Sequence, residues 1–310
     1  MSTAVQPAPN AFSPTPSQIA VAYAVCRGIT RKAAKNFYYA FLILPRPKRR
    51  ALCAVYAFMR RCDDIADDES SPPHERRQKL SEWMDAVHRA FAGEPTDEPV
   101  LLALTHAQRR FAIPAGLLDE LAYGTAMDVE ENNSSEETRV RVRYATYEDL
   151  QLYCHRVASV VGLVCIRIFG YSDPDAEPLA ERTGLAFQLT NIIRDVKEDA
   201  AAGRIYVPEE DLAQFAISPE ELAGGTDAAR YAPLLALEAE RARECYRSGD
   251  ELIPFIHEDS RPALWVLINI YRALLEKIAA RNYDVFHGKV SLTVREKLTI
   301  LSRGFLQRLL

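Results

Sequence analysis

Apolar residues recur at helical spacing along almost the whole chain after Ser17, and no run alternates between apolar and polar positions as a half-buried strand does. Helix-breaking stretches divide this pattern, among them SSPPHE at 70–75 and GEPTDEP at 93–99. TYED at 146–149 and SPEE at 218–221 are typical of capping boxes that begin helices. The pattern predicts about ten helices, which include 18–43, 47–67, 75–92, 114–130, 147–170, 175–200, 229–250, 261–281 and 292–309.

These helices follow one another without a linker of domain-boundary composition and without an internal repeat. The first 17 residues differ, because they are rich in Pro, Ser and Ala and lack the basic and apolar segments of a signal peptide. We therefore predict a disordered tail at 1–17 and a single all-α domain at 18–310.

The composition, 48% hydrophobic and 26% charged, is typical of a soluble globular protein, and a net charge of −5 disfavours nucleic-acid binding. Six cysteines without a C-x-x-C pair indicate reduced thiols and a cytoplasmic protein. The longest apolar run, VASVVGLVCIRIFGY, is interrupted by Arg167 and is shorter than the roughly 18 residues of a membrane span.

Candidate chemistry begins where the apolar helix at 47–67 ends in acids. Asp63 and Asp67 are four residues apart and therefore share a helix face, which Tyr56 and Arg60 continue toward the N-terminus. A single pair of this kind is more often a solvated helix end. Acids at a helix C-terminus also oppose the helix dipole, so their recurrence in the chain needs an explanation.

The same arrangement recurs in FQLTNIIRDVKEDAAAGRIYVP at 187–208. Asp195 and Asp199 are again four apart at the end of an apolar helix, Gln188 and Asn191 lie on nearly the same face, and Arg194 is adjacent. If the two helix ends face one another, four carboxylates converge and each raises the pKa of the others. A divalent cation removes this conflict, and Mg²⁺ is typically held by one or two carboxylates together with substrate phosphates. The arginines then provide direct charge for phosphate oxygens, so the pattern favours a diphosphate substrate with a hydrocarbon chain.

Five stretches resemble the squalene/phytoene synthase family, over roughly residues 25 to 305. They are NFYYAFLILP (36–45), YAFMRRCDDIAD (56–67), YCHRVASVVGL (153–163), QLTNIIRDVKEDAAAGRIYVP (188–208) and YDVFHGKVSL (283–292). The resemblance implies a single-domain isoprenoid synthase helical bundle with a central apolar cavity. It also implies the head-to-head condensation of two prenyl diphosphates, a prenyltransferase reaction.

The resemblance also implies roles for particular residues. Mg²⁺, with Mn²⁺ as an alternative, is expected on Asp63, Asp67, Asp195 and Asp199. The expected substrate-binding residues, which include the aromatic Phe37 of the cavity wall, are Lys35, Phe37, Tyr56, Gln188, Asn191 and Tyr271. The expected catalytic residues are Arg60 and Arg194 on the diphosphates and Tyr153 beside the reacting carbons.

The forms YCHRVASVVG and YDVFHGKVSL look most like bacterial presqualene diphosphate synthases of hopanoid pathways. The expected reaction is therefore Mg-dependent condensation of two farnesyl diphosphates to presqualene diphosphate, with no role for NADPH. The alternative is a phytoene synthase that uses geranylgeranyl diphosphate. A third hypothesis is a non-catalytic relative that binds prenyl lipid or assists assembly. Expected partners are other isoprenoid pathway enzymes and the inner membrane face, where peripheral contact would help product release.

Overall fold

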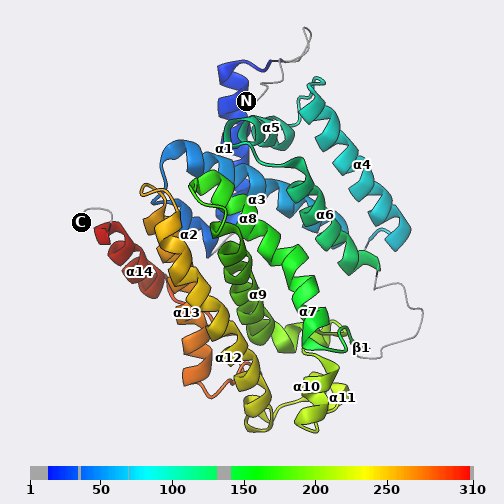
Figure 1. Ribbon diagram of the computed structural model, residues 1–310. Helices are drawn as coiled ribbons and strands as arrows, with labels where there is room; N and C mark the ends of the chain where they lie inside the picture. Colours follow the sequence, from blue (N-terminus) through cyan, green and yellow to red (C-terminus); the bar gives the residue numbers. More distant parts are fainter. Residues whose placement is uncertain (1–12, 34–35, 69, 131–140, 308–310) are drawn as a thin grey trace. The chain divides into compact units, whose positions relative to one another are not determined.

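The computed structural model describes residues 13–33, 36–68, 70–130 and 141–307, and the regular structure of these residues is helical apart from two strands of two residues each (Figure 1). The predicted all-α fold is confirmed. The helices fall into two compact units, which we describe separately.

The first unit comprises the described residues within 1–38 and 46–133. Helix α3 lies at its centre and packs against each of the other four helices. Leu52 and Phe58 of α3 are at most 2% exposed, and the Thr30 hydroxyl ties α1 to α3 by donating to the Cys53 carbonyl at 3.2 Å. The helices are α1 (Pro16–Ala33), α3 (Arg46–Ala66), α4 (Pro73–Ala92), α5 (Pro99–Phe111) and α6 (Ala115–Glu130).

The second unit comprises the described residues within 39–45 and 134–310, and α2 (Phe37–Phe41) crosses the boundary between the units. Helix α9 (Ala176–Ala201) runs through it beside α12 and also packs against α7, α8 and α13 (Figure 1). The other elements are α7 (Tyr147–Cys154), a π-helix η2 (His155–Ser159), α8 (Val160–Phe169), α10 (Glu209–Gln214), α11 (Pro219–Gly224), α12 (Ala228–Leu252), a 3₁₀ turn η3 (Ile253–Phe255), α13 (Arg261–Ala280) and α14 (Val294–Gln307).

Two glycines bring α9 into close contact with the helices that precede it. A Cβ atom at Gly184 would lie 2.6 Å from the carbonyl oxygen of Ala158, and one at Gly162 would lie 2.6 Å from that of Ala180. These separations are shorter than real Cβ contacts, so each site requires glycine. The backbones can therefore pack directly on one another, which fixes the position of α9 against η2 and α8.

Helices α7, η2 and α8 form one continuous rod, Tyr147–Phe169, of 23 residues. Its extent agrees with the helix predicted at 147–170, and among the described residues it is the one helix long and apolar enough to cross a membrane. Core helices of bundles have the same length and composition, and this rod packs along α9 in its own unit.

Two short strands, β1 (Arg141–Val142) and β2 (Arg204–Ile205), pair in parallel within the second unit. The Arg141 amide donates to the Gly203 carbonyl at 3.1 Å, and the Arg143 amide donates to the Ile205 carbonyl at 3.0 Å. No strand was predicted, because two residues give no alternation to detect. The pairing holds the segment before α7 against the segment after α9.

Where they lie among the described residues, the predicted helix ends are within two residues of the observed ends, except in the range 18–43. The predicted helix 18–43 is wrong: α1 spans Pro16–Ala33, starts inside the predicted tail, and is followed by a turn at Asn36 and the short α2. Helix α14 starts at Val294 instead of 292, because Thr293 and Glu296 exchange hydrogen bonds as a capping box. Helix α5 was not among the predicted ranges. Residues 1–12 of the predicted tail lie outside the described residues.

Both predicted capping boxes are confirmed. The Thr146 hydroxyl accepts from the Asp149 amide at the start of α7, and the Ser218 hydroxyl accepts from the Glu221 amide at the start of α11. In each case the acidic side chain accepts in return from the capping residue's amide, so amides at the helix N-terminus are satisfied.

All six cysteines are buried free thiols, as the sequence predicts. Burial raises the pKa of each thiol, to about 12 for Cys26, Cys62 and Cys165. Since the thiolate is the reactive form, these side chains are chemically inert core residues at neutral pH.

A buried ionic cluster joins α7, α10 and α12. Arg241 of α12 binds both oxygens of Asp211 (2.5 and 2.9 Å) and one oxygen of Glu238 (2.8 Å), and its guanidinium lies 4.0 Å from the Tyr147 ring centroid. Glu238 is 1% exposed, and its second oxygen has no hydrogen-bond partner among the described residues. Burial, opposed by the Arg241 charge and aided by Asp211, raises the pKa of Glu238 to about 8.

This shift predicts a pH-dependent stability. The folded protein holds the Glu238 proton up to about pH 8, whereas the unfolded chain loses it near the ordinary value of 4.5. Unfolding between these values releases the proton, so the free energy of unfolding falls as the pH rises through the window. Glu238→Gln stays neutral, and we expect its Tm relative to the wild type to rise by roughly 2–5 °C from pH 5 to pH 8.

Calorimetry of both proteins at several pH values measures this difference. The matched control is Glu240→Gln on the same helix, whose side chain is 66% exposed and pairs with Arg243. Parallel Tm curves for the wild type and Glu238→Gln would contradict the prediction.

Candidate active site

The first acidic pair lies at the C-terminal end of α3. Asp63 is the half-buried member, while Asp67 is exposed in the turn that follows Ala66, and its amide donates to the Asp63 carbonyl at 2.8 Å. The four-residue spacing therefore keeps its helical geometry just past the helix end. Burial and then the Asp63 charge raise the pKa of Tyr56, so these two predicted residues lie close together.

Arg60 pairs with a different acid from those predicted to accompany it. Its guanidinium lies 2.5 Å from Asp64 one turn along α3, and the two side chains are 41% and 49% exposed. An exposed pair of this kind contributes little to stability, so Arg60 is easily released to an anionic ligand. The end of α3 is stabilised instead by Arg76, which donates to the Ala66 carbonyl at 2.7 Å and places positive charge where the helix dipole favours it.

The second acidic pair lies in the last turns of α9. Asp195 accepts two hydrogen bonds from Arg194, one of them at 2.8 Å, and its Oδ1 lies 2.8 Å from Lys289 Nζ. Although burial opposes ionisation, these two cations outweigh it and lower the pKa of Asp195. Asp195 is therefore a carboxylate over a wide pH range.

Asp199 lies one turn further along α9 in a different electrostatic environment. Burial and then the charge of Asp195 raise its pKa to about 6, against the opposing charge of Arg204. The Arg204 Nε atom is buried and has no hydrogen-bond partner among the described residues. The end of α9 thus holds two acids, of which one is fully compensated and the other is not.

Asn191 lies on the same face, one turn before Asp195. Its Nδ2 donates to Gln188 at 3.4 Å, and its Oδ1 is buried with no hydrogen-bond partner among the described residues. A buried carbonyl oxygen without a partner is costly, and this one belongs to the helix face that carries Asp195 and Asp199. It is therefore a candidate ligand atom for a bound cation.

Lys289 reaches Asp195 because the segment 283–292 is anchored on α9. Lys197 donates to the Phe286 carbonyl, and the Phe286 ring is 2% exposed and packs 4.9 Å from the Tyr231 ring. Lys289 itself is 55% exposed and also lies 3.5 Å from Glu198. The sequence analysis missed both Lys289 and Arg204, although each lies inside a stretch that carries the family resemblance. Their positive charge, within stretches that resemble a family acting on diphosphates, was the signal that could have identified them.

Tyr271 joins the same site from α13. Its ring stacks on Phe187 of α9 at 4.5 Å between centroids, and its phenol lies near enough to Arg194 that an ionised Tyr271 would raise the pKa of Arg194. The structure therefore brings six predicted residues together in the second unit: Gln188, Asn191, Arg194, Asp195, Asp199 and Tyr271. Tyr153, at the end of α7, lies in the same unit in a separate aromatic group.

The other predicted residues are placed elsewhere. Tyr56, Arg60, Asp63 and Asp67 lie at the end of α3 in the first unit, and Phe37 begins α2, half-buried. Lys35 lies outside the described residues. Because the two acidic pairs belong to different units, their convergence stays a prediction.

Among the described residues, no group of three or more His, Cys, Asp or Glu side chains is arranged to hold a metal by itself. In phosphate-using enzymes Mg²⁺ is typically held by one or two carboxylates together with the substrate, so its site need not contain such a group.

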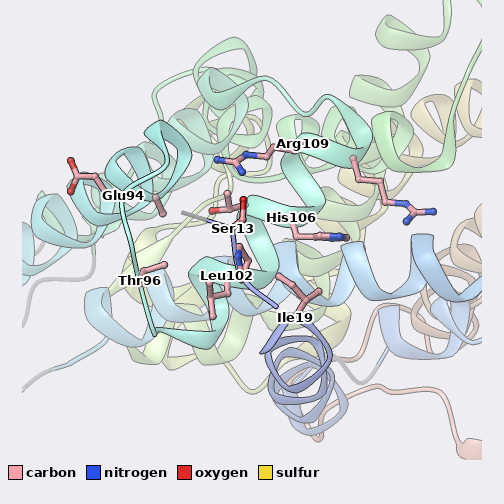
Figure 2. A pocket seen from close by; sticks show the side chains of 11 residues that line it. Ser13, Ile19, Glu94, Thr96, Leu102, His106 and Arg109 are labelled. Carbon is pink, nitrogen blue, oxygen red and sulfur yellow. The ribbon is translucent and has the colours of Figure 1, made fainter. Parts of the chain in front are cut away.

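A pocket of about 410 Å³ in the first unit contains none of the predicted site residues (Figure 2). It lies between Ile19 of α1, Leu102 and Arg109 of α5, and the connection that carries Glu94 and Thr96. Its lining mixes cationic, acidic and apolar groups without the paired acids of the candidate site.

Comparisons with known proteins identify the family. Residues 30–296 match the squalene/phytoene synthase family profile. The chain belongs to the squalene/phytoene synthase family. It is 34% identical over 300 residues to a phytoene synthase of Arthrospira platensis, a match covering 93% of each chain. It is 36% identical over 288 residues to a phytoene synthase of Mycobacterium tuberculosis, covering 92% of this chain and 90% of the relative.

Two solved structures of family members share the fold. A dehydrosqualene synthase superposes with a TM-score of 0.81 at 29% identity, over 93% of this chain and 96% of the other. The squalene synthase HpnC from Alicyclobacillus acidocaldarius superposes with a TM-score of 0.75 at 30% identity, over 87% and 97%. The all-α isoprenoid synthase fold is thereby confirmed, and the chain is a prenyltransferase-type enzyme of a family that acts on prenyl diphosphates.

Because the Asn191 side-chain oxygen is buried without a described partner, we predict that replacing Asn191 raises stability and weakens ligand binding. Asn191→Leu removes an unsatisfied buried polar atom, so we expect the Tm without ligand to rise by about 2–4 °C. The same change should reduce the Tm increase produced by Mg²⁺ with inorganic diphosphate, because a donor oxygen is lost.

Differential scanning fluorimetry with and without these ligands measures both effects. The matched control is Thr105→Val in the first unit, which also removes a buried hydroxyl without a described partner. It should raise the Tm and leave the ligand shift unchanged. An unaltered ligand shift in Asn191→Leu would show that Asn191 is not part of the binding site.

Proposed function

We propose that this enzyme condenses two molecules of geranylgeranyl diphosphate head to head to form phytoene. The observation that carries this proposal is the 34–36% identity, over more than nine tenths of the chain, to proteins named phytoene synthase. The motifs by themselves predicted farnesyl diphosphate and presqualene diphosphate, with phytoene as the alternative. The relatives support that alternative better.

Farnesyl diphosphate is the second candidate substrate. It is supported by the dehydrosqualene and squalene synthases whose structures resemble this one at 29% and 30% identity. The chemistry of the first step is shared by both candidates, so the roles of the charged residues below do not depend on chain length.

The first step is departure of diphosphate from one substrate, which breaks its C1–O bond and leaves an allylic cation. Arg60 and Arg194 are each paired with an acid of their own helix, and in this proposal each exchanges that acid for diphosphate oxygens. Lys289 and Arg204 add positive charge at the end of α9. Fixed cations that meet developing negative charge lower the barrier without reorganising.

The donor set of α9 fits Mg²⁺. Asn191 offers a carbonyl oxygen without a described partner, and Asp195 and Asp199 offer carboxylates one turn apart on the same helix. We propose that these residues, together with Gln188, hold the metal, with Asp63 and Asp67 of α3 contributing from the other acidic motif. Bound Mg²⁺, or Mn²⁺ in its place, neutralises negative charge on the diphosphate.

The second step joins the two chains. The C2=C3 double bond of the second substrate attacks the cation at C1, and loss of a proton closes a cyclopropane that retains one diphosphate. In phytoene formation this second diphosphate then departs, the ring rearranges, and a final proton is lost to form the central double bond. No reductant is consumed, because the last cation is quenched by proton loss, so NADPH is not expected to take part.

The protein must keep water from the cation, which would otherwise form an alcohol. Tyr153, 4% exposed, presents an aromatic ring and a hydroxyl that are shielded from solvent. We assign to it the handling of the proton or the cation beside the reacting carbons. An aromatic face stabilises a desolvated cation by up to about 2 kcal/mol without reacting with it.

We propose a cytoplasmic protein that works at the inner membrane face, since its substrates are amphiphilic and its product is insoluble in water. Other isoprenoid enzymes, of the chain-elongating class, must supply the prenyl diphosphate. A non-catalytic lipid-binding role is disfavoured, because both acidic pairs are intact.

Activity is predicted to need a divalent cation and both acidic pairs. Asp63→Asn and Asp195→Asn should each lower turnover on the order of 10²-fold, because each removes a charge that organises the leaving diphosphate. EDTA should abolish turnover, and Mg²⁺ should restore it. The control is Asp250→Asn on α12, whose side chain is 56% exposed and pairs with Arg272. Full turnover in EDTA would contradict the metal assignment.

Chain length is tested by competition between the two prenyl diphosphates. With Mg²⁺ present, we expect a higher kcat/KM for geranylgeranyl diphosphate, phytoene as the product by mass analysis, and no effect of NADPH. A higher kcat/KM for farnesyl diphosphate, with a cyclopropyl diphosphate or its dehydrosqualene product, would establish the second candidate instead.

A further inference from the structure

Three tyrosine rings from separate parts of the second unit stack on one another. Tyr153 of α7 lies 5.3 Å from the ring of Tyr144 and 5.3 Å from that of Tyr206, and the latter two are 6.4 Å apart. All three pairs of ring planes are within 29° of parallel, and each residue is at most 8% exposed. We call this group the tyrosine cluster.

The two outer tyrosines follow the two short strands. Tyr144 comes two residues after β1, and its carbonyl accepts from the Glu209 amide at 3.0 Å. Tyr206 comes directly after β2, between the buried Ile205 and Val207. The β1–β2 hydrogen bonds therefore fix the backbone segments that carry the two outer rings with respect to each other.

Two further features lie next to the tyrosine cluster. The Arg143 guanidinium lies 5.4 Å from the centroid of the Tyr206 ring, a cation–π contact. Tyr153 lies one residue before Cys154, which precedes the π-helix His155–Ser159. π-Helical turns of this kind occur frequently at functional sites. Tyr153 therefore contacts two rings from segments next to the β1–β2 pairing, and its own helix continues into the π-helix.

We propose that Tyr144 and Tyr206 are positioning residues, which hold the Tyr153 ring in one orientation and aim its hydroxyl for the condensation. This rests on the proposed function and on the role assigned there to Tyr153. A tyrosine side chain turns about two bonds, and contact of its ring with two others removes that freedom before substrate binds. A small loss of orientation at a reacting group lowers turnover strongly without weakening substrate binding.

The ring, and not the hydroxyl, of Tyr206 does the positioning in this proposal. Tyr206→Phe keeps the stacked face and should retain kcat within about 3-fold of the wild type, whereas Tyr206→Leu should lose kcat on the order of 10-fold or more. KM for the prenyl diphosphate should stay unchanged in both. Tyr144→Leu should behave as Tyr206→Leu and carries the test if Tyr206→Leu does not fold.

A double variant separates positioning from general packing. Tyr153→Phe alone should lower kcat while preserving diphosphate binding, because only the hydroxyl is lost. If Tyr206 acts through that hydroxyl, adding Tyr206→Leu to Tyr153→Phe should lower kcat by less than about 2-fold more. Losses that multiply in the double variant would overturn the proposal.

The matched control is Tyr23→Leu in the first unit. Tyr23 is 4% exposed and its ring packs edge-on against His106 at 5.5 Å. It should lose Tm as Tyr206→Leu does and keep its kcat at temperatures where it remains folded. If Tyr23→Leu loses kcat to the same extent, the effect of Tyr206→Leu is one of stability, and the proposal is wrong.

The readouts also distinguish this inference from the proposed function. A wild-type enzyme that converts neither geranylgeranyl nor farnesyl diphosphate would refute the function itself. An active wild type with Tyr206→Leu and Tyr144→Leu equal to it in kcat would refute the positioning role alone.

Discussion

The second unit depends on the direct backbone contact between α9 and the rod formed by α7, η2 and α8. Gly184 and Gly162 leave no space for a side chain where these helices meet. Because backbone atoms make the contact, it fixes the distance between α9 and the rod. It also fixes the rotation of α9 about its axis and the position of α9 along that axis. Asp195 and Asp199 at one end of α9, and Tyr153 on the rod, therefore take positions that no side-chain rearrangement easily alters.

The two acidic helix ends differ in how their charge is compensated. On α3, Arg60 is held by a half-exposed acid and the end of the helix is neutralised by Arg76 from α4. On α9, two cations converge on Asp195, while Asp199 is only partly compensated by Arg204 and the buried Asn191 oxygen has no hydrogen-bond partner among the described residues. The end of α9 therefore carries the larger unfavourable electrostatic energy, since burial raises the free-energy cost of each polar group that lacks a partner.

Long helices and their caps could be predicted from the sequence because their signals are local. Helix α9 was placed at 175–200 and spans Ala176–Ala201, and both capping boxes start helices as expected. The acids of α9 and their polar neighbours on one face followed from the period of the helix. Each of these features depends on residues within a few positions of one another.

The features that could not be predicted all join distant segments. Lys289 pairs with Asp195 across 94 positions, and it does so from an irregular stretch where spacing carries no information. The strands β1 and β2 are too short to show a period, yet they bring Tyr144 and Tyr206 to the same ring. The π-helix is another such case, since its residues Ala158 and Ser159 lie against Gly184 of α9, which is distant in the sequence.

The burial of all six cysteines has a consequence for spectroscopy. Their thiols are shielded, and burial has moved their pKa values above the range in which maleimides react quickly. A cysteine introduced at an exposed site in each unit would therefore take up dye selectively, with the native cysteines left in place. Energy transfer between two such dyes would report the separation of the two units in solution, both without and with substrate.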